Sequence, residues 1–222
     1  MTLIRHFPGH RHFGAVVGGI CAFCLIAILV FSDSFLIRID QFVARECYEY
    51  AIERPTVRAF FEYATAFGNG RTLNAVGTFS VVVLLLRREW IRALIYAIGQ
   101  LSARSISSYL KGQFQRKRPE YVDWPDFSFP SGHAFGSALV YGLVAFMLVR
   151  IWAGSRLRLP LACCAIGFVL LIGLSRIMLG VHYMSDVLAG LSLGMAWGAA
   201  WEMFANRFDR NPGNRSEDAA TT

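Results

Sequence analysis

The chain contains long uncharged stretches, and these constrain its fold more than any other feature of the sequence. Residues 13–31 include no Asp, Glu, Lys or Arg, and apolar runs of similar length recur toward the C-terminus. A helix needs about 20 apolar residues to cross a bilayer. Within the bilayer the backbone must satisfy its own hydrogen bonds, which only helices and closed barrels achieve. The repeated runs therefore predict an all-α, polytopic membrane protein.

The charge content agrees with this class, because only 17% of the residues are charged whereas soluble domains average about 25%. The net charge of +7 suits cytoplasmic loops and anionic lipid headgroups, so we expect the bilayer as a partner and no nucleic acid. A single domain over residues 1–222 is expected. Its spans are expected at residues 13–31, 72–86, 93–110, 132–151, 159–174 and 187–204, with tails at 1–12 and 207–222.

Residues 32–71 form the longest stretch between two expected spans. Acidic and basic residues alternate there, and Phe35, Ile39 and Phe42 are among the apolar residues that recur at helical spacing. This pattern predicts one or two amphipathic helices at the membrane interface, broken at Pro55. They could form a collar through which a lipid reaches a site, or a simple interfacial cap.

Two of the later spans carry unusual side chains. In the third span Arg104, Ser108 and Lys111 fall on one helical face, and polar groups on a span face the bundle interior or a wet cavity. The last span has glycines four residues apart, at Gly190, Gly194 and Gly198. Such spacing allows close helix contact. Packing within the chain is the expected use, with dimerisation as the alternative.

The orientation of the spans follows from the short loops. Residues 87–92 and 150–158 each contain three arginines, and basic loops stay in the cytoplasm. This orientation puts both termini in the cytoplasm. Lys and Arg are evenly divided between the two sides unless Arg176 and the cluster at residues 111–118 are set aside as ligands for an anion.

With six spans, three polar stretches reach the same side of the membrane: residues 111–119, 130–133 and 175–186. A shared site is possible only because of this placement. Between two spans, a histidine and its charged neighbours are costly and mark a functional site. His182 and Asp186 are four residues apart, so on a helix they share one face and the carboxylate can hold the imidazole.

The other stretches add groups that suit a phosphate. Arg176, Lys111 and Arg118 are fixed cations, and the arginine fork matches phosphoryl oxygens. Ser131 can cap the fourth span, where Gly132 offers a backbone N–H to an anion. Taken alone, the cations could be a basic interfacial belt and PSGH an ordinary helix cap. His133 begins the same helix.

Together the motifs read K-x6-RP, PSGH and SR-x5-H-x3-D. This arrangement resembles the type 2 phosphatidic acid phosphatase superfamily, which includes bacterial membrane lipid phosphatases of the phosphatidylglycerophosphatase B and undecaprenyl-diphosphate phosphatase kinds, glucose-6-phosphatase and soluble vanadium haloperoxidases. All three motifs match in residue type, spacing and order over residues 111–186.

The resemblance implies a mechanism and its residues. His182 would be the nucleophile that forms a phosphohistidine, with Asp186 holding its other ring nitrogen. His133 would protonate the leaving lipid oxygen. The phosphoryl oxygens would be bound by Lys111, Arg118, Ser131, Gly132 and Arg176. No metal and no cofactor are implied, and Asp123 and Asp126 are interpreted as part of a solvated loop.

The expected activity is hydrolysis of a lipid phosphate at the periplasmic or extracellular face of a bacterial inner membrane. Phosphatidylglycerophosphate, phosphatidate and undecaprenyl diphosphate are candidate substrates, and the short Lys-to-Arg spacing disfavours lipid A. Arg104, Arg116 and Lys117 could favour a diphosphate or contact headgroups. A phosphotransferase with the same intermediate and a non-catalytic anion or lipid transporter are the alternatives.

Overall fold

The computed structural model describes residues 9–32, 35–151 and 155–208, and within them every regular element is a helix. The expected all-α class is therefore confirmed. The helices are α1 (Gly9–Phe31), α2 (Phe35–Ile52), α3 (Pro55–Ala66), α4 (Gly70–Leu86), α5 (Trp90–Phe114), α6 (Gly132–Ile151), α7 (Ser155–Met178) and α8 (Met184–Asn206). The expected tails lie largely outside these residues, except that residues 9–12 belong to α1.

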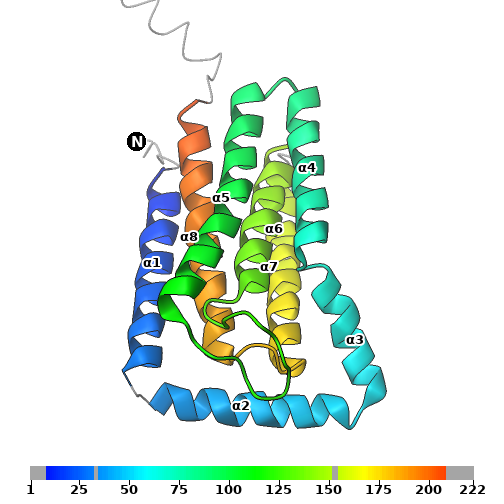
Figure 1. Ribbon diagram of the computed structural model, residues 1–222. Helices are drawn as coiled ribbons and strands as arrows, with labels where there is room; N and C mark the ends of the chain where they lie inside the picture. The colour runs from blue at the N-terminus through cyan, green and yellow to red at the C-terminus, as the bar shows by residue number, and fades with distance from the viewer. Residues whose placement is uncertain (1–8, 33–34, 152–154, 209–222) are drawn as a thin grey trace, which may run out of the picture.

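The long helices α1 and α4–α8 stand side by side as a bundle, while α2 lies across one end of it and α3 leads from α2 to α4 (Figure 1). Helix α8 packs against α1, α5, α6 and α7, so it is the central helix. The loop that joins α5 to α6 returns over the α2 end of the bundle (Figure 1).

Four helices of the described chain are long and apolar enough to cross a membrane: His12–Phe31, Gly132–Ile151, Arg156–Met178 and Met184–Asn206. A fifth span arises if α3 and α4, which are bent by 43° at their junction, count as one. Helix α5 does not qualify because polar residues such as Gln100 and Arg104 interrupt its apolar sequence. Many large apolar side chains on the bundle remain exposed, including Leu101 and Leu159, as expected for a surface that faces lipid.

The region between the first and second expected spans is helical on both sides of Pro55, as predicted. Pro55 opens α3 at its first turn, where a missing backbone N–H costs nothing. Asn69 caps α4, since its side chain accepts a 2.8 Å hydrogen bond from the Thr72 N–H. These two signals divide the segment into α2, α3 and α4.

The glycines of α8 serve packing within the chain. A Cβ at Gly190 would lie 2.5 Å from the carbonyl oxygen of Ser131, and one at Gly194 would lie 2.5 Å from that of Phe135. The backbones of α6 and α8 therefore touch at the end of α6 that carries the PSGH motif.

Arg92 does not belong to a loop, in contrast to the basic loop expected at residues 87–92. It lies inside α5 and is 3% exposed, and its Nη1 donates to both carboxylate oxygens of Glu202 on α8 at 2.8 and 2.9 Å. Tyr96 donates to the same carboxylate at 2.7 Å. A buried arginine needs such a partner, and the partner comes from a helix that is remote in sequence.

Candidate active site

His182 lies in the tight turn between α7 and α8. The backbone N–H groups of Val181 and His182 both donate to the carbonyl oxygen of Arg176, at 3.1 and 3.2 Å. Gly180 makes the turn possible with φ of +67°, and a Cβ there would lie 2.7 Å from the ring of Tyr48. The turn holds the His182 side chain inside the protein, where it is 2% exposed.

Asp186 faces His182, although not for the reason that the sequence suggested. His182 precedes α8, which begins at Met184, so the two residues do not share a helical face. Instead, Asp186 Oδ2 accepts the Tyr183 N–H at 2.9 Å in the first turn of α8. His182 Nδ1 lies 3.5 Å from the same oxygen, within ion-pair range but without hydrogen-bond geometry.

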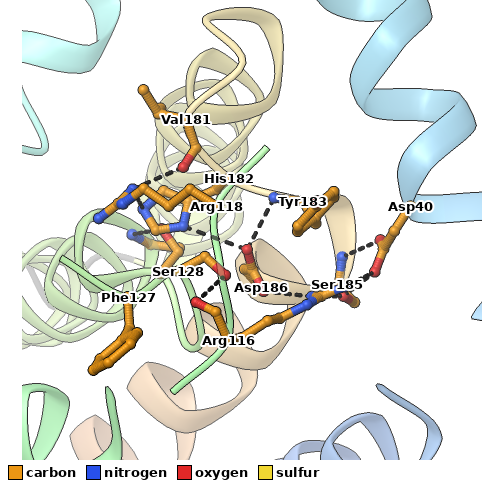
Figure 2. Close-up of polar contacts among 12 residues, drawn as sticks. Asp40, Arg116, Arg118, Phe127, Ser128, Val181, His182, Tyr183, Ser185 and Asp186 are labelled. Carbon is orange, nitrogen blue, oxygen red and sulfur yellow. Dashed lines mark hydrogen bonds and ion pairs between the residues drawn. The ribbon is translucent and has the colours of Figure 1, made fainter. Parts of the chain in front are cut away.

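The other ring nitrogen of His182 faces a cation. Nη1 of Arg118 lies 3.1 Å from His182 Nε2 and 2.7 Å from the carbonyl oxygen of Val181, as Figure 2 shows. A guanidinium can only donate hydrogen bonds. Nε2 must therefore be an acceptor, which puts the imidazole proton on Nδ1, toward Asp186.

Burial lowers the pKa of His182 to about 4, although Asp186 acts in the opposite direction. The ring is consequently neutral at neutral pH. A neutral ring with a lone pair on Nε2 is the form that can act as a nucleophile.

A cavity of about 350 Å³ opens beside His182. Six of the eight site residues predicted from the sequence line it: Lys111, Arg118, Gly132, His133, Arg176 and His182. Asp186 and Ser131 are fully buried outside the lining. The Ser131 N–H donates to the carbonyl oxygen of Asp186 at 3.0 Å, so Ser131 joins α6 to α8.

Two of the lining cations contact Asp126 in the α5–α6 loop. Nζ of Lys111 lies 2.6 Å from Asp126 Oδ2, and Nε of Arg118 donates to the Asp126 carbonyl oxygen at 2.8 Å. Burial acts to raise the pKa of Asp126, but the hydrogen bond from Lys111 and the nearby cations lower it overall. Asp126 is thus an ion-pair partner beside the site, although its side chain remains 50% exposed in the loop, as its interpretation as part of a solvated loop implies.

Arg176 retains capacity to bind an anion. It lies in the last turn of α7 and is 8% exposed, and its Nη1 donates to the Thr65 hydroxyl of α3 at 2.7 Å. Its Nε is buried without a hydrogen-bond partner. A buried donor without a partner is costly, and an anion in the adjoining cavity would satisfy it.

A second ion-pair network, which was not predicted from the sequence, lies behind Asp186. Arg116 bridges Asp186 and Asp40, with contacts of 2.6 and 2.7 Å (Figure 2). The sequence suggested that Arg116 could contact a lipid headgroup or a diphosphate. Instead, its guanidinium is engaged by these two carboxylates. Asp40 lies one helical turn from the apolar residues Leu36 and Val43 of α2. A carboxylate on the apolar face of a helix is the sequence feature that could have indicated a buried ion pair.

Metal-ligating groups are not clustered in the part of the chain that the structure describes. No three His, Cys, Asp or Glu side chains there are placed to hold a metal ion. The charged residues around the cavity are four cations and one carboxylate, Asp126, and this set suits an anion better than a divalent metal.

Comparison with known proteins adds to these observations. The family model described as "PAP2 superfamily" matches residues 92–209. The crystal structure of a transmembrane PAP2 type phosphatidylglycerolphosphate phosphatase from Bacillus subtilis superposes with a TM-score of 0.81 at 25% identity, covering 89% of this chain and 98% of that one.

Curated relatives match a shorter part of the chain. Phosphatidylglycerophosphatase B of Bacillus subtilis is 38% identical over 96 residues, 41% of this chain and 47% of that protein. Decaprenylphosphoryl-5-phosphoribose phosphatase of Mycobacterium tuberculosis is 38% identical over 120 residues, 51% and 59% of the two chains. Lipid A 1-phosphatase of Rhizobium etli is 35% identical over 113 residues, 48% and 47%. The chain spans about half the length of these relatives.

Proposed function

The chain belongs to the PAP2 superfamily, and we propose that it is an integral membrane enzyme that hydrolyses the phosphate monoester or diphosphate of a lipid. The supporting observation is the cavity where a neutral His182 and a second histidine, His133, meet the cations Lys111, Arg118 and Arg176. Fixed cations in a partly buried pocket stabilise the charge of a phosphoryl group in transfer.

In the first step, Nε2 of His182 attacks phosphorus in line with the lipid oxygen. An N–P bond forms as the P–O bond to the lipid breaks, and His133, in its protonated imidazolium form, gives a proton to the leaving oxygen and becomes neutral. The imidazole then carries positive charge. Asp186, 3.5 Å from Nδ1, is placed to balance that charge by closing into a hydrogen bond.

Arg118 has two positions in this scheme. In the free protein its Nη1 occupies the lone pair of His182 Nε2, which leaves no room for attack on phosphorus. A phosphoryl oxygen that draws the guanidinium away frees the nucleophile. Substrate binding and activation of His182 are then one event, because an ionised oxygen is a stronger acceptor than a neutral imidazole.

In the second step, His133 takes a proton from water as the water oxygen attacks phosphorus. The N–P bond breaks, inorganic phosphate leaves, and His182 returns to its neutral form. Transfer to a lipid or sugar hydroxyl in place of water would make the enzyme a phosphotransferase with the same residues.

The substrate class rests on the size of the cavity and on the relatives. A volume near 350 Å³ suits a phosphorylated headgroup, whereas the apolar chains would remain between helices or in the bilayer. The named relatives act on phosphorylated lipids. We propose phosphatidylglycerophosphate, phosphatidate or undecaprenyl diphosphate as the substrate.

The membrane topology belongs to the same proposal. Helix α5 would be a sixth crossing segment with its polar face turned to the cavity, where it contributes Arg104, Ser107, Ser108 and Lys111. The site would then open at the periplasmic or extracellular face, with both termini in the cytoplasm.

The test uses the full chain, purified in detergent, and a panel of lipid mono- and diphosphates. Wild-type protein is expected to release inorganic phosphate, and His182→Ala to release none. His12→Ala is the matched control, because His12 lies in α1 and packs against Phe146. Phosphate release that survives in His182→Ala would contradict the phosphohistidine. Phosphorylated acceptor in place of phosphate would indicate a transferase, and no reaction in wild type would favour a transporter.

A further inference from the structure

Asp40 is a fully buried carboxylate on α2, outside the residues that match the family. Its Oδ1 accepts the Ser185 N–H at 2.9 Å, and its Oδ2 accepts from the Ser185 hydroxyl and from Nη2 of Arg116, the latter at 2.7 Å. Burial of a carboxylate is costly without such partners. All of these partners lie beside Asp186.

Arg116 connects Asp40 to Asp186. Its Nη1 lies 2.6 Å from Asp186 Oδ1, and the guanidinium lies over the ring of Tyr183 with its carbon 4.3 Å from the ring centroid. Asp186 therefore has one oxygen engaged by Arg116, while the other faces Tyr183 N and His182. Figure 2 shows the continuous path from Asp40 through Arg116 and Asp186 to His182.

The charges along this path indicate an electrostatic role for Asp40. Arg116 and Asp186 alone would be a neutral pair, and Arg116 would compete with a positively charged His182 for the single carboxylate. With Asp40 present, one cation is shared by two carboxylates and a net negative charge remains. That charge is available to the imidazole when it becomes cationic, and it acts strongly because the site is buried.

We propose that Asp40 is a positioning residue for the reaction. It holds Arg116 and offsets its charge, so that Asp186 can stabilise the cationic form of His182. This inference rests on the proposed phosphohistidine mechanism. Helix α2 thereby contributes to the chemistry as well as covering the end of the bundle.

A purely structural tie between α2 and α8 is the competing explanation, and it makes a different prediction. The contact of Asp40 with the Ser185 N–H does not involve Arg116, although Arg116 Nη1 also donates to the Ser185 hydroxyl at 2.7 Å. A structural tie should therefore matter equally with or without Arg116. An electrostatic role through Arg116 should disappear when the Arg116 charge is removed.

The experiment is a double-mutant cycle on the full chain in detergent, with kcat, KM and the thermal midpoint measured for each variant. Asp40→Asn is expected to lower kcat by at least about tenfold with KM changed by less than about threefold, within the range of coupling between contacting residues. In the Arg116→Gln background the same substitution should change kcat by less than about threefold. Glu46→Gln, an exposed change of equal charge on α2, is the control.

An unchanged kcat in Asp40→Asn would overturn the inference, as would equal effects in both backgrounds. If Asp40→Asn fails to fold, the comparison of Arg116→Gln with the double variant still decides, because the double variant leaves no unpaired cation in the network. A wild-type protein that releases no phosphate would instead contradict the proposed function.

Discussion

Arg118 lies 3.1 Å from His182 through Nη1 and Nε2, and this contact links the proposed phosphate-binding group to the proposed nucleophile. It determines the tautomer of the imidazole, because the arginine can only donate. In the proposed mechanism, an anion draws the guanidinium away from this lone pair before His182 attacks phosphorus. Arg118 is therefore expected to affect both binding and chemistry.

Arg118→Gln should lower kcat/KM by about 10²–10³, as expected when a donor to a developing oxyanion is lost. Initial rates with the preferred lipid phosphate measure the effect. Lys117→Gln is the control, because Lys117 is an exposed cation of the same segment. A loss no greater than that of the control would remove Arg118 from the site.

Asp126 forms an ion pair with Lys111, so a phosphate bound at the proposed site would compete with this carboxylate. Asp126→Asn should lower the inhibition constant for inorganic phosphate by about three- to tenfold, because one charge-assisted contact contributes about 1.5–3 kcal/mol and only part of it is recovered. Asp123→Asn changes an exposed residue of the same loop and should have little effect. A weaker inhibition in Asp126→Asn would show that Asp126 supports binding.

The buried neutral His182 predicts acid sensitivity of the fold. Its pKa is about 4 in the native state and about 6.5 in an unfolded chain. Between these values the unfolded state binds a proton that the native state does not, so stability falls as pH falls from about 6.5 to 4.

His182→Gln, which cannot titrate, should lose less stability than wild type over this range. Thermal midpoints in detergent at several pH values measure the difference. Other titrating groups contribute to both proteins and cancel in the comparison. Parallel curves for the two proteins would refute a depressed pKa for His182.

The ion pair between Arg92 and Glu202 lies in α5 and α8, away from the cavity residues. Glu202→Gln should destabilise the protein by about 3–5 kcal/mol, because it removes the buried carboxylate charge that both Arg92 and Tyr96 contact. Glu62→Gln breaks an exposed pair with Arg58 and should cost less than about 1 kcal/mol. Denaturation in detergent measures both, and KM should be unchanged in the folded fraction of either variant.

Removal of divalent metal ions is expected to leave the activity intact. The proposed mechanism uses Lys111, Arg118 and Arg176 in place of a divalent ion, so excess EDTA should leave the rate of phosphate release within about twofold of its starting value. A large loss that added Mg²⁺ restores would contradict the proposed site.

Local patterns in the sequence predict the class of the protein and most of its helices. Apolar runs and the signals at Pro55 and Gly180 act over a few residues, so they can be recognised locally. The family resemblance is confirmed, because three motifs at defined spacings are specific even though each is weak alone. The six expected spans are not confirmed, since four helices of the described chain, or five segments with α3 and α4 as one, can cross a membrane. Helix α5 combines a long helix with the polar side chains of a cavity wall.

The pairing of the charges depends on how the helices and loops pack together. Asp40 meets Arg116, Asp126 meets Lys111 and Glu202 meets Arg92, and no local pattern indicates these partners. Buried charges must find opposite charges wherever the fold brings them. Likewise His182 faces Asp186 through a turn rather than along a helix. Local sequence governs the elements, whereas the electrostatic surroundings of the site depend on contacts between segments far apart in the chain.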